Sequence, residues 1–102
     1  GMVDQSAAIG LINLFIGDLV RHGFKPNRVF LFGSYAKGNQ QEYSDIDVAI
    51  WDSKFSGCLP LDMEQLKSII SKYSKIEIHT FNSLEEPSPL SHEIEATGIR
   101  IL

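Results

Sequence analysis

The chain has 102 residues, of which 43% are hydrophobic and 22% charged, and its formal net charge is −4. This length suits one domain, which we assign to residues 2–102, with Gly1 interpreted as the remnant of a cleaved tag. An acidic chain is poorly suited to binding extended nucleic acid, because such binding relies on Lys and Arg side chains that neutralise the phosphate charges. A domain this small buries limited surface, so we expect it to form a homo- or hetero-oligomer.

Membrane and secretion signals are not apparent in the sequence. No apolar run approaches the roughly 20 residues that a membrane-spanning helix needs. Residues 1–4 have neither the basic nor the apolar segment of a secretory signal. The single cysteine, Cys58, cannot form an internal disulfide. These features predict a cytoplasmic protein that has no association with a membrane.

The first half of the chain alternates between helical and extended patterns. Residues 4–22 are predicted to form a helix, because apolar side chains recur there at helical spacing and Gly23 follows at the end. The apolar run 28–32 predicts a strand buried on both faces. Residues 33–39 are predicted to form a tight turn and a short helix. The alternation over 44–51 predicts a second strand.

The third helix and third strand follow a loop over 52–60. Asp62 is predicted to cap a helix that runs to about Tyr73, with Gln65 completing a capping box. Met63, Leu66, Ile69, Ile70 and Tyr73 would form the apolar face of this helix. Residues 75–81 alternate again between polar and apolar side chains and predict another strand.

The last part of the chain predicts a short helix after a loop over 82–88. Ser88 is placed to cap this helix, Pro89 to open it and Gly98 to end it. The tail 99–102 is predicted to form a small edge strand or to pack on the core. The resulting order of elements indicates an α/β (α+β) fold, with a small β-sheet flanked by helices.

Three acidic residues on two predicted strands form a candidate metal site. Successive side chains of a strand point to opposite faces, so Asp45 and Asp47 are expected side by side. Neighbouring carboxylates repel each other and favour either a proton or a bound cation. Two Mg²⁺ ions roughly 3.5–4 Å apart can hold the attacking and leaving oxygens of a phosphoryl transfer. Glu77, on the next strand, is the candidate third ligand.

The turn after the first strand is a candidate phosphate-binding loop. Gly33 allows the backbone to come close to a phosphate group. Ser34 supplies a hydroxyl donor, and backbone amides at the start of the following helix favour anions. Lys37 adds a positive charge nearby. We therefore expect Gly33, Ser34 and Lys37 to bind a nucleotide.

Gly33-Ser34, ten further residues and then Asp45-x-Asp47 resemble the signature of the DNA polymerase beta-like nucleotidyltransferase superfamily. The small size and the Gly-Ser-Tyr-Ala-Lys-Gly run that begins at Gly33 are most similar to its minimal nucleotidyltransferases, the antitoxin-like partners of HEPN-domain proteins. The resemblance covers about residues 29–81. It implies a palm-like nucleotidyltransferase fold with a small mixed sheet.

The resemblance also implies roles for individual residues. Gly33 and Ser34 would hold the triphosphate, Asp45 and Asp47 would bind two Mg²⁺ ions, with Mn²⁺ as the alternative, and Glu77 would replace the usual aspartate. The implied activity is transfer of a nucleoside monophosphate, AMP by expectation, from ATP or another nucleoside triphosphate to a hydroxyl. In toxin–antitoxin members the acceptor is a tyrosine of the HEPN-type partner toxin.

Other interpretations remain open at this point. The chain could be a catalytically weak or inactive antitoxin-like module that neutralises a helical partner by contact, which the glutamate at position 77 favours. Metal-dependent glycosyltransferases also use Asp-x-Asp, but they need a much larger nucleotide-sugar domain. His79 shares a face with Glu77, but a lone histidine is more often packed or solvated, so it is left out of the catalytic set. Tyr35 is assigned a packing role.

Overall fold

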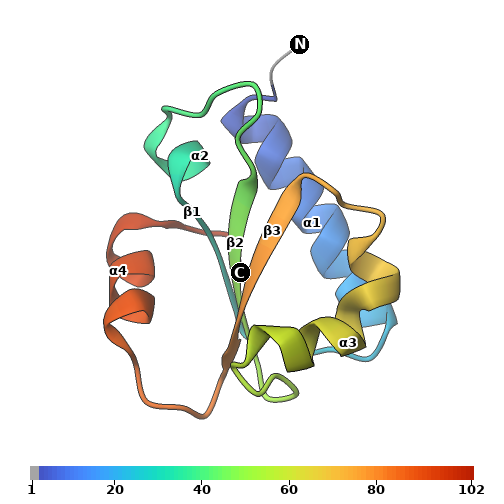
Figure 1. Ribbon diagram of the computed structural model, residues 1–102. Coiled ribbons are helices and arrows are strands. Elements are labelled where there is room, and N and C mark those ends of the chain that lie inside the picture. Colours follow the sequence, from blue (N-terminus) through green and yellow to red (C-terminus); the bar gives the residue numbers. More distant parts are fainter. Residues whose placement is uncertain (1–2) are drawn as a thin grey trace.

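The computed structural model describes residues 3–102 (Figure 1), and the expected tag remnant at Gly1 lies outside these residues. Within them, no helix combines the length and apolar character needed to span a bilayer. The elements in chain order are α1 (Gln5–Arg21), β1 (Arg28–Phe32), α2 (Ser34–Lys37), β2 (Ile46–Asp52), α3 (Leu59–Ile70), β3 (Ile76–Asn82), α4 (Pro89–Thr97) and β4 (Ile99–Arg100).

The four strands form one mixed sheet in the order β3-β2-β1-β4. β1 runs antiparallel to both β2 and β4, whereas β2 and β3 are parallel. The parallel pair is joined through α3, as parallel strands require a crossover connection. The predicted small mixed sheet with flanking helices is thereby confirmed, and the tail contributes an edge strand as expected.

Helices cover the two faces of the sheet unequally (Figure 1). α1 and α3 pack on one face, where alternate strand residues such as Leu31, Val48 and Ile78 join the main core. α4 packs on the other face, where Ile94 meets Phe30, Ala49 and Trp51. β1 therefore contributes buried side chains to both faces, as its continuous apolar sequence predicts.

Local capping signals bound the first and last helices, and those of the last helix act as the sequence predicts. Asp4 caps α1 by accepting a hydrogen bond from the Ala7 amide at 2.7 Å. Ser88 caps α4 through a reciprocal pair of hydrogen bonds with Ser91, and Gly98 follows its last residue. These caps satisfy backbone donors that the first turn of a helix leaves unpaired.

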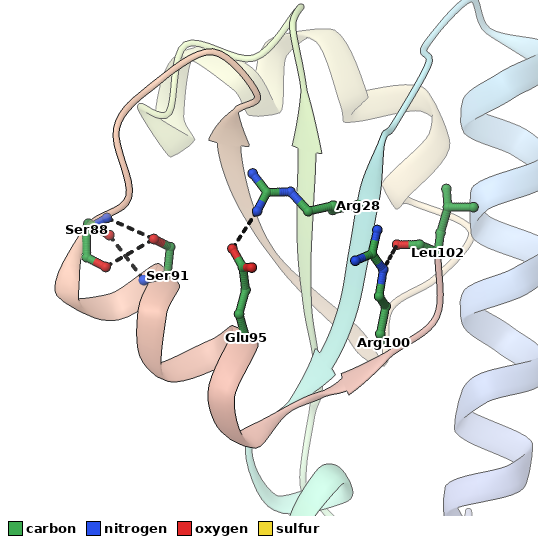
Figure 2. Close-up of polar contacts among 6 residues, drawn as sticks. All are labelled: Arg28, Ser88, Ser91, Glu95, Arg100 and Leu102. Carbon is green, nitrogen blue, oxygen red and sulfur yellow. Dashed lines mark hydrogen bonds and ion pairs between the residues drawn. The ribbon is translucent and has the colours of Figure 1, made fainter.

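An ion pair connects the C-terminal part of α4 to the sheet. Figure 2 shows the Arg28 guanidinium of β1 donating to the Glu95 carboxylate of α4, with Nη1 and Oε1 2.6 Å apart. The same guanidinium lies over the Trp51 ring, 4.7 Å from its centroid. Arg100 of β4 donates from Nε to the Leu102 carbonyl oxygen. α4 is thus held against the sheet by its apolar face and by this ion pair.

The predicted start of the third helix is wrong. α3 begins at Leu59, Cys58 occupies its N-cap position and Pro60 lies in its first turn, so Asp62 is not the cap. The helix also ends at Ile70 rather than Tyr73, because the chain there tightens into turns that lead to β3.

Asp62 is buried and links three parts of the fold. Its carboxylate accepts hydrogen bonds from the amides of Ser56 at 2.8 Å and Gly57 at 3.0 Å, and from the Thr80 hydroxyl at 2.6 Å. Burial opposes ionisation of Asp62, but these hydrogen bonds together outweigh it and lower the pKa of its carboxyl group. The loop before α3, the helix and β3 therefore share one buried acceptor.

Replacing Asp62 with alanine is expected to lower the free energy of unfolding by about 3 kcal/mol, because buried donors lose their acceptor. The loss is measured by urea denaturation at pH 7, with Glu64→Ala, an exposed change on the same helix, as the control. The folded pKa lies below the unfolded value, so this stabilisation is present above about pH 4 and is lost as the pH falls through the folded pKa. Equal unfolding free energies for the two variants at pH 7 would contradict this role.

Candidate active site

The turn after β1 lies directly against Asp47. The antiparallel register pairs Phe32, the last residue of β1, with Asp47 near the start of β2. Gly33 follows with φ +72°, and a Cβ atom there would lie 2.2 Å from the Asp47 Oδ2 atom. Both the left-handed backbone and this close approach require glycine. The candidate phosphate loop and the carboxylate are therefore in contact.

The parallel register of β2 and β3 brings Glu77 and His79 close to Asp47. Asp47 pairs with Glu77 across the sheet, and Ala49 pairs with His79. Asp47, Glu77 and His79 each offer one ligand atom, and these three atoms all lie within 4.8 Å of one another. The His79 Nε2 atom is 3.9 Å from the Asp47 Oδ1 atom. We call these three residues the acidic cluster.

His79 is the member that sequence reasoning left out of the site. Its ring also packs edge-on against Phe32, with 4.9 Å between centroids. The available signal was its position two residues after Glu77 on an alternating strand, which places both side chains on one face. What the sequence alone does not supply is the pairing of β3 with β2, which aligns that face with Asp47.

The electrostatic environment of Asp47 opposes its negative charge. Burial raises the pKa of its carboxyl group, and the negative charge of Glu77 raises it further. Asp45 acts in the same direction, whereas His79 lowers the pKa. The charge of an ionised Asp47 is thus incompletely balanced by the side chains around it.

This donor set fits a divalent cation. Two carboxylates and an imidazole are converging ligands, and the carboxylate oxygens are the type that Mg²⁺ and Mn²⁺ prefer. A cation beside Asp47 would also supply the positive charge that its surroundings lack. The metal-binding interpretation therefore agrees with both the geometry and the electrostatics of the acidic cluster.

Asp45 lies at the margin of this arrangement. β2 begins at Ile46 rather than at residue 44, so Asp45 precedes the strand and is exposed. It does not belong to the group whose ligand atoms meet within 4.8 Å. Instead, Asp45 and Glu77 border a hollow on the side of β3 and α3. The structure thus brings Asp47 and Glu77 together directly and places Asp45 beside them.

The residues predicted to bind the nucleotide lie at the other side of Asp47. Ser34 begins the short helix α2 and is half-buried, and Lys37 ends it and is exposed. Gly33 and Lys37 line a hollow of about 140 Å³ between β1 and α4. The Tyr35 side chain is fully buried in the main core, as its expected packing role requires.

Comparisons with known proteins bear on the family to which the chain belongs. A family model described as "Polymerase beta, Nucleotidyltransferase" matches residues 16–102. The protein MJ0435 of Methanocaldococcus jannaschii, named as a candidate protein adenylyltransferase, is 35% identical over 68 residues, which are 65% of this chain and 69% of that protein.

Two solved structures resemble the fold. One is a variant of the toxin–antitoxin pair MntA-HpeT, with 20% identity and a TM-score of 0.61, and the other is a toxin–antitoxin structure with AMP-PNP, with 23% identity and a TM-score of 0.63. Each alignment covers 88% of this chain and 71% of the other. At these identities the likeness establishes the fold alone, whereas the matched family model spans most of the chain. The chain therefore belongs to the polymerase beta nucleotidyltransferase family, and its activity is nucleotidyl transfer.

Proposed function

We propose that this chain transfers AMP from ATP to a hydroxyl group of a partner protein, with Mg²⁺ as the metal. The observation that carries the proposal is the convergence of Asp47 and Glu77 directly beside the Gly33 turn. The name of the Methanocaldococcus jannaschii relative supports AMP as the transferred group. The cytoplasm, where ATP is abundant, is the proposed location.

The loop residues would hold the triphosphate. Gly33 lets the loop backbone lie directly against Asp47, because any side chain there would meet that carboxylate, so loop amides and metal ligands would face the same phosphates. Ser34 would donate its hydroxyl, and Lys37, which is exposed at the end of α2, would neutralise part of the phosphate charge. The ATP substrate would thereby be oriented with its α-phosphate toward the acidic cluster.

The carboxylates would hold the metal ions. Asp47 and Glu77 would bind Mg²⁺, or Mn²⁺ as the alternative, and Asp45 would complete a two-ion site from its position before β2. When bound, such ions neutralise phosphate charge and orient the two oxygens that exchange at phosphorus. His79 would act as a positioning residue, because its imidazole favours the ionised form of Asp47.

The proposed reaction balances as a single displacement. The acceptor hydroxyl oxygen forms a bond to the α-phosphorus of ATP, and the bond from that phosphorus to the oxygen bridging to the β-phosphate breaks. Pyrophosphate leaves, and the hydroxyl proton passes to solvent water. Asp47, Glu77 and the loop contribute mainly by orientation and by balancing charge, since such transfers need little covalent chemistry from the protein.

The acceptor we propose is a tyrosine of a HEPN-type toxin. The structures that resemble this fold are named as toxin–antitoxin assemblies, and one of them includes AMP-PNP, which supports a toxin partner and a nucleotide substrate. The small size of this domain also favours a partner protein that supplies the acceptor.

A second candidate function is neutralisation of the partner by contact alone. Two observations favour it: the third carboxylate is the longer Glu77, and Asp45 lies outside the acidic cluster. In that case the carboxylates would be dispensable for toxin inhibition, although the surrounding surface would still bind the partner.

One experiment separates the two candidates. A purified tyrosine-bearing HEPN-domain protein is incubated with ATP labelled at the α-phosphate, Mg²⁺ and this chain, and the label on the HEPN-domain protein is counted. The Asp45→Ala/Asp47→Ala double variant is expected to transfer label at least about a thousandfold more slowly. A double variant of Glu85→Ala and Glu86→Ala, which removes the same charge from exposed positions, is the control.

Inhibition of the toxin is measured with the same proteins. If the double aspartate variant still neutralises the toxin although it transfers no label, contact is the correct explanation. If the wild type labels no acceptor with either Mg²⁺ or Mn²⁺, adenylyl transfer to this partner class is contradicted.

A further inference from the structure

The His79 imidazole lies beside the Asp47 carboxylate without being sealed off from solvent. Its Nε2 atom is 3.9 Å from the Asp47 Oδ1 atom, and the side chains of His79 and Asp47 are 32% and 25% exposed. The edge of the ring contact with Phe32, with 4.9 Å between centroids, fixes where the imidazole lies. A nitrogen donor is therefore held next to a carboxylate at a place that a dissolved ion can reach.

We propose that His79 binds the metal ion directly, together with Asp47 and Glu77, and that this nitrogen ligand makes the site select a first-row transition-metal ion such as Mn²⁺ over Mg²⁺. The presence of an ion at the acidic cluster is part of the proposed function, on which this inference rests. What is added is the residue that sets the choice of metal. The neutral imidazole is the form that binds metal ions, so the ion would take the place of a ring proton.

The spacing of the three ligand atoms suits a single ion. Two atoms that each lie about 2.1 Å from one ion are at most about 4.2 Å apart, and the separation of Asp47 Oδ1 from His79 Nε2 is within that limit. A Glu77 oxygen completes the group, in which no separation exceeds 4.8 Å. Glu77 is exposed, so rotation about its side-chain bonds can close the remaining distance.

The strand registers put these ligands on one face of the sheet, beside the candidate phosphate loop. Asp47 is opposite Glu77, and His79 follows Glu77 by two residues, so the three side chains share a face. Phe32, opposite Asp47 on its other side, belongs to the same face, and Gly33 comes next in the chain. An ion bound by His79 would therefore lie where the proposed function requires the phosphates to be.

The nitrogen atom is what discriminates between the metals. Mg²⁺ prefers oxygen ligands in near-ideal octahedral geometry, and usually takes one or two carboxylates with waters and phosphates. First-row transition-metal ions bind the same oxygens but bind mixed nitrogen and oxygen sites more tightly. Asp47 and Glu77 would serve both kinds of ion, whereas His79 favours only the second kind. The acidic cluster thus differs from a site built of carboxylates alone.

The test measures Mn²⁺ binding to the metal-free chain by electron paramagnetic resonance, with Mg²⁺ as the competitor. In the wild type, spin-echo spectra of bound Mn²⁺ should show coupling to a ¹⁴N nucleus. His79→Gln, which offers an oxygen instead, should abolish this coupling and weaken Mn²⁺ binding about tenfold, while Mg²⁺ binding changes less than about twofold. The matched control is His92→Gln, which replaces an exposed histidine of α4 and should retain the coupling and both affinities.

A second variant separates the nitrogen from the packing of the ring. His79→Phe keeps an aromatic ring against Phe32 but has no ligand atom, so it should lose the ¹⁴N coupling and the preference for Mn²⁺ as His79→Gln does. If either variant weakens Mn²⁺ and Mg²⁺ binding equally, His79 acts only through the charge of Asp47 and the inference is overturned. Coupling that persists without His79 overturns it as well.

Label transfer by the same proteins tells this inference apart from the proposed function. If bound Mn²⁺ shows the His79-dependent coupling but neither metal supports transfer of AMP to the HEPN-domain protein, the proposed function fails and the ligand role of His79 stands. If transfer occurs but bound Mn²⁺ shows no ¹⁴N coupling, the proposed function stands and the ligand role of His79 is refuted.

Discussion

Asp47→Asn is expected to reduce nucleotidyl transfer at least about a thousandfold while leaving the metal-free protein as stable as the wild type or more stable. The loss follows from the position of Asp47 between the Gly33 turn and Glu77, where its carboxylate would bind the metal of the proposed site beside the substrate phosphates. The unchanged or higher stability follows from the raised pKa of its carboxyl group, whose burial and proximity to Glu77 oppose ionisation.

The pH dependence of this effect has a definite sign. The folded pKa of Asp47 lies above its unfolded value, so its contribution to stability is fully present below the unfolded pKa and is lost as the pH rises through the folded pKa. Without divalent ions, the stability of Asp47→Asn relative to the wild type should therefore increase as the pH rises. Binding of Mg²⁺ needs the ionised carboxylate, so the apparent affinity for Mg²⁺ should rise over the same pH interval.

Thermal unfolding with and without Mg²⁺ measures both effects. Mg²⁺ at about 100 times its dissociation constant should stabilise the wild type by about 2.7 kcal/mol, and Asp47→Asn much less. Glu42→Gln, which removes a nearby exposed charge outside the acidic cluster, should respond to Mg²⁺ like the wild type. Equal stabilisation of Asp47→Asn and wild type by Mg²⁺ would argue against Asp47 as a ligand.

Gly33→Ala is expected to lower the free energy of unfolding by about 3 kcal/mol or more. Two costs combine: the backbone has φ +72°, and the new Cβ atom would meet the Asp47 Oδ2 atom at 2.2 Å. Because the methyl group would displace the Asp47 carboxylate, transfer activity should be lost even at temperatures where the variant stays folded.

Gly38→Ala is a control for a positive φ without a clash, at a ψ of 16° where Gly33 has −150°. Gly38 ends the same short helix with φ +76°, but a Cβ atom there would meet nothing within 4 Å. Its cost should be the backbone term alone, about 1–2 kcal/mol. Urea denaturation of both variants gives the difference. If Gly33→Ala and Gly38→Ala destabilise equally, the close approach to Asp47 has no energetic consequence.

A double-mutant cycle measures the coupling free energy between the Gly33 and Asp47 substitutions. Removing the carboxylate in Gly33→Ala/Asp47→Ala should recover part of the stability lost in Gly33→Ala, with a coupling of at least about 1 kcal/mol. Additive effects of the two substitutions would show that the loop and the carboxylate do not constrain each other.

Elements specified by neighbouring residues were predictable from the sequence. Asp4 caps α1, and Ser88 and Gly98 bound α4, because each signal acts within one turn of its own helix. The strand β1 was predictable from its continuous apolar run, since burial on both faces leaves no place for polar side chains.

The errors in the prediction arise where distant segments compete with local signals. Asp62 has the residue type and the position of a helix cap, but Ser56, Gly57 and Thr80 offer it buried donors from the loop and from β3. Asp45 continues the alternating pattern of β2, but the pairing of β2 with β3 begins at Ile46 opposite Ile76, so Asp45 lies outside the strand. Tertiary contacts outweigh local propensity in both cases.

By itself, the sequence determined the class of the fold, the Gly33-Ser34 turn and the carboxylates at positions 45, 47 and 77, because these depend on residue type and on short-range periodicity. Only the tertiary structure decided which side chains meet. The β2–β3 register brings His79 into the acidic cluster, and the β1–β2 register places Gly33 in contact with Asp47. Strand register is a relation between distant segments, so side-chain alternation within one strand cannot specify it.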